Sequence, residues 1–244
     1  MKILDDLISN LNNNRDAIVR EVYACAFWTA VVSKHCGLSS TLTEGHPHHK
    51  TVRDPGKLRG KSALELAQYV RSDSLLEASI GMAAINSLID IDEARCTERN
   101  AFDALAEKGR DKNIVIVGHF PWIPKLRDIA RNLWVIERRP REEEGELPAE
   151  AAEEILPKAD VVGLTGTALT NHTIERLLEL SRGKFIVMVG PSSPLSPVLF
   201  DYGIDIIGGS EVVDIEKMVR CITEGATHTQ TKGVRHLNMF KDGM

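Results

Sequence analysis

The chain has 244 residues, a length that suits one large or two modest domains. Apolar residues make up 43% of the sequence and charged residues 27%, so there is enough apolar material for a core. The net charge is only -5 with both signs mixed, which disfavours a nucleic-acid-binding surface. The sequence lacks both the ~18-residue apolar run of a membrane span and the apolar start of a signal peptide, so we expect a cytoplasmic protein without a membrane span.

The four cysteines lie far apart in the sequence and form no C-x-x-C pair. They are Cys25, Cys36, Cys96 and Cys221. This spacing predicts reduced, buried thiols rather than a disulfide framework or a zinc site.

The first elements alternate between helix and strand. Residues 3–11 have apolar side chains at helical spacing and predict an amphipathic helix. Residues 18–32 are rich in β-branched and aromatic residues without Gly or Pro, which predicts one long strand covered on both faces. Residues 37–43 could form its partner strand, and residues 45–62 form a polar loop rich in Gly, Pro and His.

Two helices follow the loop. Ser62 with Glu65 three residues later has the pattern of a capping box. The helix over 74–89 is almost uncharged in its middle, so we expect it to be buried on most sides. Gly81 within it predicts the close approach of another backbone. This order of elements favours an α+β domain over residues 1–108.

From about residue 109 short apolar runs alternate with helical patterns, which predicts an α/β domain over 109–244 with a parallel sheet and right-handed crossovers. The predicted strands are 114–117, 133–136, 161–164, 185–189 and 204–207. The predicted helices are 124–131, 148–156, 172–181, 194–200 and 214–223. The polar residues 108–112 suit a linker at the boundary.

Ligands of open parallel sheets bind at the carboxyl ends of the strands, so the residues that follow each strand are the candidates. Four of these loops contain Gly or hydroxyl residues, which allow close backbone approach and can bind phosphate or carboxylate oxygens. Such residues are also typical of ordinary βα turns. Because four loops should converge at one edge of the sheet, we favour a ligand cleft there. The candidate loops are 118–122, 165–172, 190–194 and 208–210.

A dinucleotide fingerprint is missing from the sequence. The first strand of the second half ends in GHFPWI rather than G-x-G-x-x-G. Glu137 follows Gly118 by roughly 20 residues, the offset of a ribose-binding acid. It stands beside a charged run over 138–144, however, so a surface position is the favoured interpretation.

Histidines are the strongest chemical signal. His46, His48 and His49 stand within four residues of one another, and neutral imidazoles at such spacing can bind Zn, Ni, Cu or Fe. No nearby Asp or Cys completes a familiar pattern, and polar loops often carry histidines without a metal. His119 and His172 follow two different strands and could face one cleft; a general base, a metal ligand and a structural histidine all suit His119.

Four segments in order resemble a known family: ASIGMAAINSL, IVGHFP, LTGTALTNHT and VGPSSPL. They are similar to the putative heavy-metal chelation family, a group of uncharacterised bacterial and archaeal proteins. The resemblance implies an enolase N-terminal-like α+β domain over 1–108, without the catalytic barrel of enolase. It also implies a Rossmann-like three-layer domain with a parallel sheet over 109–244, and a site in the cleft between them.

The resemblance and the strand ends together give the candidate site. His119 and Asn171 are the candidate catalytic residues, and the cluster of His46, His48 and His49, which matches no family-wide motif, is the candidate metal site. The candidate ligand-binding residues are Asn86, Gly118, Phe120, Pro121, Glu137, Thr165, Gly166, Thr167, Pro191 and Ser192.

The leading hypothesis is a protein that binds or processes a heavy metal or metal chelate in its interdomain cleft, with a transition-metal ion as the implied cofactor. Ser192 would hold the anionic part of the ligand. One alternative is an enzyme that uses a nucleoside cofactor such as S-adenosylmethionine, with Glu137 on the ribose. Another is a non-catalytic partner protein that forms a homodimer through its first domain. The sequence does not decide whether the protein turns over a substrate.

Overall fold

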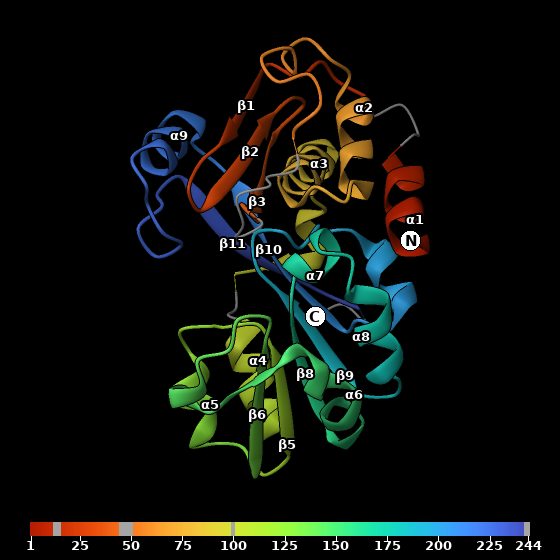
Figure 1. Cartoon of the computed structure of the whole chain (residues 1–244), viewed down its shortest axis with the longest axis vertical. Coiled ribbons are helices and arrows are strands. Elements are labelled where there is room, and N and C mark those ends of the chain that lie inside the picture. Colours follow the sequence, from red (N-terminus) through yellow and green to blue (C-terminus); the bar gives the residue numbers. More distant parts are fainter. Residues whose placement is uncertain (12–15, 44–50, 99–100, 242–244) are drawn as a thin grey trace.

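The computed structural model describes residues 1–11, 16–43, 51–98 and 101–241. It is a mixed α/β structure with two sheets, one of three antiparallel strands and one of eight mostly parallel strands (Figure 1). No helix in the described ranges has both the length and the apolar character needed to cross a membrane.

The smaller sheet consists of β1 (Glu21–Ala24), β2 (Trp28–Val32) and β3 (Cys36–Ser40), in that order. Alternate residues of a strand point to opposite faces. Accordingly Trp28, Ala30 and Val32 pack against α9 (Ile215–Thr223), while α3 (Leu75–Leu88) packs against β2 and β3 and shares a core with Val31. Strand β2 is therefore buried along its whole length.

The prediction of one strand over 18–32 is wrong, because these residues form a hairpin of β1 and β2. Glu21 pairs with Val32 and Ala24 with Thr29, and the chain reverses over residues 25–27. No Gly or Pro marks this turn, and Phe27 at its tip is 54% exposed. Of these two strands, β2 is covered on both faces, whereas β1 is a half-exposed edge strand.

The helices of the first half follow the sequence closely. Helix α1 (Lys2–Leu11) buries its apolar stripe, and the Ser62 side chain accepts a hydrogen bond from Glu65 N at the start of α2 (Ala63–Ala67). Helix α3 is buried on most sides, as expected. A Cβ on Gly81 would lie 2.0 Å from Val70 N, so the expected backbone approach is confirmed; it comes from a 3-10 helix, η1 (Gln68–Arg71).

All five strands predicted for the second half are present and mutually parallel. They are β5 (Asn113–Val117), β6 (Asn132–Glu137), β8 (Val161–Thr165), β9 (Phe185–Val189) and β10 (Ile206–Val212). The full strand order is β4-β11-β10-β9-β8-β5-β6-β7. The chain runs from β5 outward to β6 and then returns to the other side of β5 at β8, so the order reverses between β5 and β8.

Three strands of this sheet were not predicted. Strand β7 (Glu146–Pro148) extends it in parallel beside β6, while β11 (Val234–Phe240) and β4 (Cys96–Thr97) extend the other edge in antiparallel pairing. Strands β4 and β7 are too short to leave a periodic pattern.

Short helices connect and cover the larger sheet. They are α4 (Ala101–Gly109), η2 (Glu93–Arg95), α5 (Ile123–Arg127), η3 (Glu142–Glu144), η4 (Ala149–Ala151), α6 (Ala152–Ile155), η5 (Leu156–Lys158), α7 (Thr167–Thr170), α8 (Ile174–Leu180) and η6 (Pro197–Tyr202). Figure 1 shows α6 and α8 on one side of the sheet, with α4 on the other.

The two sheets share one continuous apolar core that includes residues of α1, α3 and α8. Polar contacts add to it: Tyr202 donates a hydrogen bond to Asp6 Oδ2 at 2.5 Å, and Ile3 N donates to Glu175 Oε1 at 3.1 Å. The domain division at residue 109 stays a prediction. Strand β4 and helix α4 precede that residue and yet pair with or pack on the larger sheet.

Candidate functional site

A cleft of about 1130 Å³ lies at the point where the strand order of the larger sheet reverses. Gly118, Thr165 and Thr167 line it from the ends of β5 and β8. Ser40, Thr41 and Leu75 line it from the end of β3 and the start of α3. Both halves of the chain thus contribute walls, at the position where open parallel sheets bind ligands.

Gly118 allows the two loops at the reversal point to approach each other. Its φ is +111°, and a Cβ there would lie 2.9 Å from Thr165 Cβ and 3.3 Å from Phe120 Cε2. A larger residue would strain the backbone and push the loops apart.

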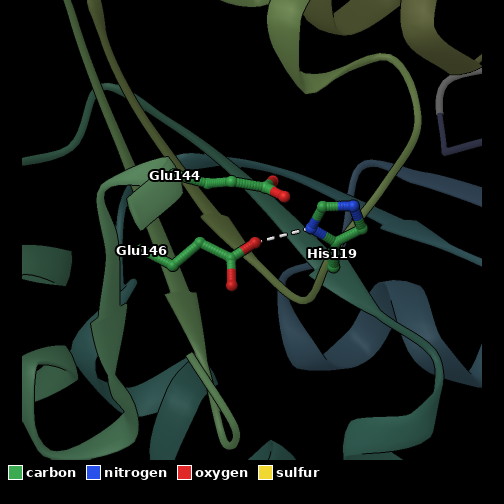
Figure 2. Close-up of side chains that lie close together, drawn as sticks. All are labelled: His119, Glu144 and Glu146. Atoms are coloured by element: carbon green, nitrogen blue, oxygen red, sulfur yellow. Dashed lines mark hydrogen bonds and ion pairs between the residues drawn. The ribbon is translucent and has the colours of Figure 1, made fainter. Parts of the chain in front are cut away.

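His119, on the cleft wall, is held by a buried carboxylate. Its Nδ1 lies 2.5 Å from Glu146 Oε1 (Figure 2), and the side chain of His119 is 34% exposed. Its Nε2 lies 3.2 Å from Arg141 Nη1. Because a guanidinium can only donate, Nε2 must accept. The proton of the neutral ring therefore sits on Nδ1 and is donated to Glu146.

Glu146 is ionised because its hydrogen bonds outweigh its burial. Burial raises the pKa of this carboxyl, but Arg141 N donates to Oε2 at 2.8 Å, His119 donates to Oε1, and the charge of Arg141 is near. The net effect is a pKa below the ordinary glutamate value. The buried carboxylate is thus a fixed negative partner for the imidazole.

Glu144 completes a group of three side chains that could hold a cation (Figure 2). One ligand atom each of His119, Glu144 and Glu146 lies within 4.8 Å of the others. Glu144 is exposed and forms an ion pair with Arg141 Nη1 at 3.2 Å. An imidazole with carboxylates suits borderline ions such as Zn²⁺, Ni²⁺ and Cu²⁺.

The described residues that line the cleft include no cysteine, and soft metals prefer thiolate ligands. Burial raises the pKa of Cys36 to about 12 and that of Cys96 to about 11, so both stay protonated thiols at neutral pH. Both lie in strands of the core. The donor chemistry of the cleft therefore favours borderline over soft metals.

The loop after β8 presents hydroxyl and amide groups to the cleft. Thr165 Oγ1 and Thr167 Oγ1 are 2.9 Å apart, and Asn171 Oδ1 accepts from Thr173 N at 3.2 Å and from Thr173 Oγ1 at 2.7 Å. His172 also lines the cleft, but its Nε2 bonds to Val70 O at 2.7 Å, and its φ is +66°. His172 thus connects this loop to η1.

Glu137 lines the cleft at the end of β6, together with Arg138 and Arg139. Its Oε1 accepts a hydrogen bond from Arg138 N at 2.8 Å. Both guanidinium groups are exposed, and the described residues give them no ion pair. This part of the wall can therefore offer positive charge to an anionic ligand.

Asn86, Pro191 and Ser192 lie in a closed seam instead, which fastens the smaller sheet to the loop after β9. Asn86 Nδ2 donates to Leu38 O at 2.7 Å and to Pro191 O at 3.2 Å. The Ser192 hydroxyl is fully buried, accepts from Ser40 N at 2.9 Å and lies 3.0 Å from Ser39 Oγ. None of the three is among the described residues that line the cleft.

Three further candidates also lie outside the described lining. A Cβ on Gly166 would lie 2.4 Å from Ser193 Oγ, so this glycine packs against the loop after β9. Phe120 stacks on Trp122 with ring centroids 4.6 Å apart, and Pro121 follows it. His46, His48 and His49 fall outside the described residues.

Arg141, Glu144 and Glu146 surround His119 but are not among the described residues that line the cleft. The sequence did not suggest them, because they stand in or beside what looks like a solvated charge run. Gly145, with φ +74°, ends η3 and turns the chain back into β7, which places Glu146 level with Val135 of β6. A glycine that interrupts a charged run was the available signal.

Comparison with known proteins identifies the family of this chain. A family model described as "Putative heavy-metal chelation" matches residues 100–240, and a second model of the same description matches residues 4–89. An uncharacterised protein of Methanocaldococcus jannaschii is 26% identical over 206 residues, which cover 82% of this chain and 79% of that protein.

Two crystal structures of proteins with unknown function from the DUF364 family are also similar. The one from Desulfitobacterium hafniense has 28% identity and a TM-score of 0.83, and the match covers 98% of each chain. The one from Pyrococcus horikoshii has 18% identity and a TM-score of 0.82 over 98% of this chain and 99% of that one, which shows the shared fold. The chain belongs to the DUF364 family, which is described as putative heavy-metal chelation.

Proposed function

We propose that this protein binds a small metal chelate in the cleft, with His119 Nε2 as its ligand to the metal. The observation that carries this proposal is the pairing of His119 with buried Glu146, which keeps the proton on Nδ1 and leaves the Nε2 lone pair as the donor. A carboxylate behind a metal-binding histidine fixes its tautomer and raises its basicity.

The donor set favours a chelate over a bare ion. Closed metal sites use about four protein ligands. Here Glu146 already accepts two hydrogen bonds, which leaves only His119 and Glu144 as metal ligands, and both contact Arg141 in this structure. A chelator would supply the remaining ligands. The cleft of about 1130 Å³ is far larger than an ion needs and is comparable to the ~300–1,000 Å³ of small-molecule sites.

The polar wall of the cleft suits the carboxylates of a chelator. Arg138 and Arg139 can donate charge-assisted hydrogen bonds, and the hydroxyl pair of Thr165 and Thr167 can donate neutral ones.

Calorimetric titration tests the proposal. Ni²⁺ with citrate and Ni²⁺ with nitrilotriacetate are titrated into a chain in which His46, His48 and His49 are alanine, so that this cluster contributes nothing. His119→Ala, which removes the direct ligand, should weaken binding by at least the ~10–100-fold that loss of an outer-shell partner costs. The matched control is His35→Ala, since His35 Nε2 also pairs with a carboxylate, Asp90, at 2.9 Å but lies outside the cleft lining. No binding of either complex, or equal binding by His119→Ala, would refute the proposal.

A second candidate, a nucleoside cofactor, rests on the position of Glu137. This carboxylate lines the cleft at the end of the strand next to β5, where a ribose-binding acid would lie. Thermal-shift measurements with S-adenosylmethionine test it, since a ligand at 100 times its Kd adds about 2.7 kcal/mol of stability. A shift that Glu137→Gln abolishes supports this candidate, and the absence of any shift rules it out.

A further inference from the structure

Arg141 contacts every member of the group around His119. Its Nη1 lies 3.2 Å from His119 Nε2 and 3.2 Å from Glu144 Oε1, while its backbone N donates to Glu146 Oε2. The guanidinium thus takes up both donors that Glu146 leaves for a cation. A positive side chain holds the place where a metal would bind.

A metal ion and this guanidinium cannot use the site together. The Nε2 lone pair accepts either one hydrogen bond or one metal ion. Two positive charges at this separation would also repel each other. The side chain of Arg141 is 52% exposed, so it can leave the site without burying its charge elsewhere.

We propose that Arg141 is a built-in competitor that excludes free metal cations and admits anionic metal chelates. This inference rests on the function proposed above. An anionic chelate carries carboxylates that can accept hydrogen bonds from the displaced guanidinium. Arg141 therefore exchanges one hydrogen-bond acceptor for another when it leaves His119. A free cation provides no such partner and must displace the guanidinium unaided.

The backbone contact makes Arg141 suitable for substitution. Arg141 N bonds to Glu146 Oε2 whatever the side chain, so Arg141→Gln removes the guanidinium and keeps the hydrogen bond of the buried carboxylate. Arg127→Gln is the matched control. It makes the same charge change nearby, but Arg127 Nη2 donates to the backbone carbonyl of Glu144 at 2.8 Å rather than to the imidazole.

The experiment compares free Ni²⁺ with the nickel–nitrilotriacetate anion by calorimetry, in the chain that lacks His46, His48 and His49. Arg141→Gln should raise the affinity for free Ni²⁺ about tenfold or more and lower the affinity for the anion. The increased affinity for free Ni²⁺ should disappear in the double variant that also carries His119→Ala. Arg127→Gln should change neither affinity by comparable amounts. Circular dichroism and thermal melting verify that each variant is folded.

The outcomes separate this inference from the function on which it rests. If the chelate binds through His119 but Arg141→Gln leaves the affinity for free Ni²⁺ unchanged or lowers it, Arg141 is not a competitor and the inference alone is overturned. If folded wild type and folded Arg141→Gln bind neither form of nickel, both proposals are overturned.

Discussion

The cleft and the seam have loops of similar composition at neighbouring strand ends, yet only the cleft is open. The loops after β5 and β8 expose His119, Thr165 and Thr167 to a space of about 1130 Å³. The loop after β9 carries Gly190, Pro191 and Ser192 and is covered by β3, with the Ser192 hydroxyl fully buried. The smaller sheet decides which strand ends remain accessible.

Gly, Ser and Pro at a strand end serve packing as readily as binding. Gly118 and Gly166 both permit close approach of a neighbouring loop, but only Gly118 lines the cleft. In the seam, Ser40 N and the Leu38 carbonyl would lack partners without Ser192 and Asn86. Substitutions in the seam should therefore change stability, and those in the cleft should change binding.

The largest effect is expected from Gly166→Val. The new Cβ would lie 2.4 Å from Ser193 Oγ and 2.6 Å from Ser193 N, so the two loops must separate. We expect a loss of about 3 kcal/mol or more in the free energy of unfolding, measured by urea denaturation. The neighbouring Thr167→Val, which only removes a cleft hydroxyl, is the control and should change stability much less. Equal stability of the two variants would contradict the packing role of Gly166.

A smaller loss is expected from Asn86→Ala. Two carbonyl groups, of Leu38 and Pro191, lose their donor, at a cost of about 2 kcal/mol in unfolding free energy. The affinity for nickel–nitrilotriacetate should stay the same, because Asn86 lies outside the described cleft lining. Asn171→Ala should give the reverse pattern, weaker binding with a smaller loss of stability. Weaker chelate binding by Asn86→Ala would show that seam and cleft act as one site.

Ser192→Ala should cost about 1 kcal/mol, because Ser40 N, at a partly buried position, loses its acceptor. Its chelate affinity should equal that of the wild type, measured by the same titration. A variant with wild-type stability but impaired binding would return Ser192 to the ligand site that the sequence suggested.

An effect of similar size at neutral pH, which disappears in acid, is expected from Glu146→Gln. The folded-state pKa of Glu146 lies below its unfolded value, so its carboxylate stabilises the protein above the ordinary glutamate pKa of about 4.3. This contribution is lost as the pH falls through the folded-state pKa. Urea denaturation should show Glu146→Gln less stable than wild type by about 1 kcal/mol at neutral pH, with the difference vanishing in acid. A difference in unfolding free energy that grows in acid would contradict a folded-state pKa of Glu146 below its unfolded value.

Local patterns predicted much of the fold. The burial of α3, the capping of α2 by Ser62 and the five parallel strands all follow from periodicity and turn residues within each segment. The hairpin within 18–32 could not be predicted in this way, because its turn over residues 25–27 contains neither Gly nor Pro.

The site was less predictable, because burial at its key positions comes from distant contacts. The preceding Gly145 is the one local feature that sets Glu146 apart from the nearby acids, and the burial itself arises because β7 pairs with β6. Likewise Ser192 resembles a ligand-binding serine until β3 is placed over it. The positions of Gly118, His119 and Thr165 could be inferred, since the carboxyl ends of parallel strands share one edge.

The most direct test is a crystal structure of the protein soaked with nickel–nitrilotriacetate, with anomalous scattering used to locate the metal. We expect a nickel peak in the cleft near His119 Nε2, at about the 2.0–2.1 Å of a zinc–imidazole bond, with the Arg141 guanidinium moved away from the imidazole. A peak bound elsewhere on the protein, with His119 still paired to Arg141, would contradict it.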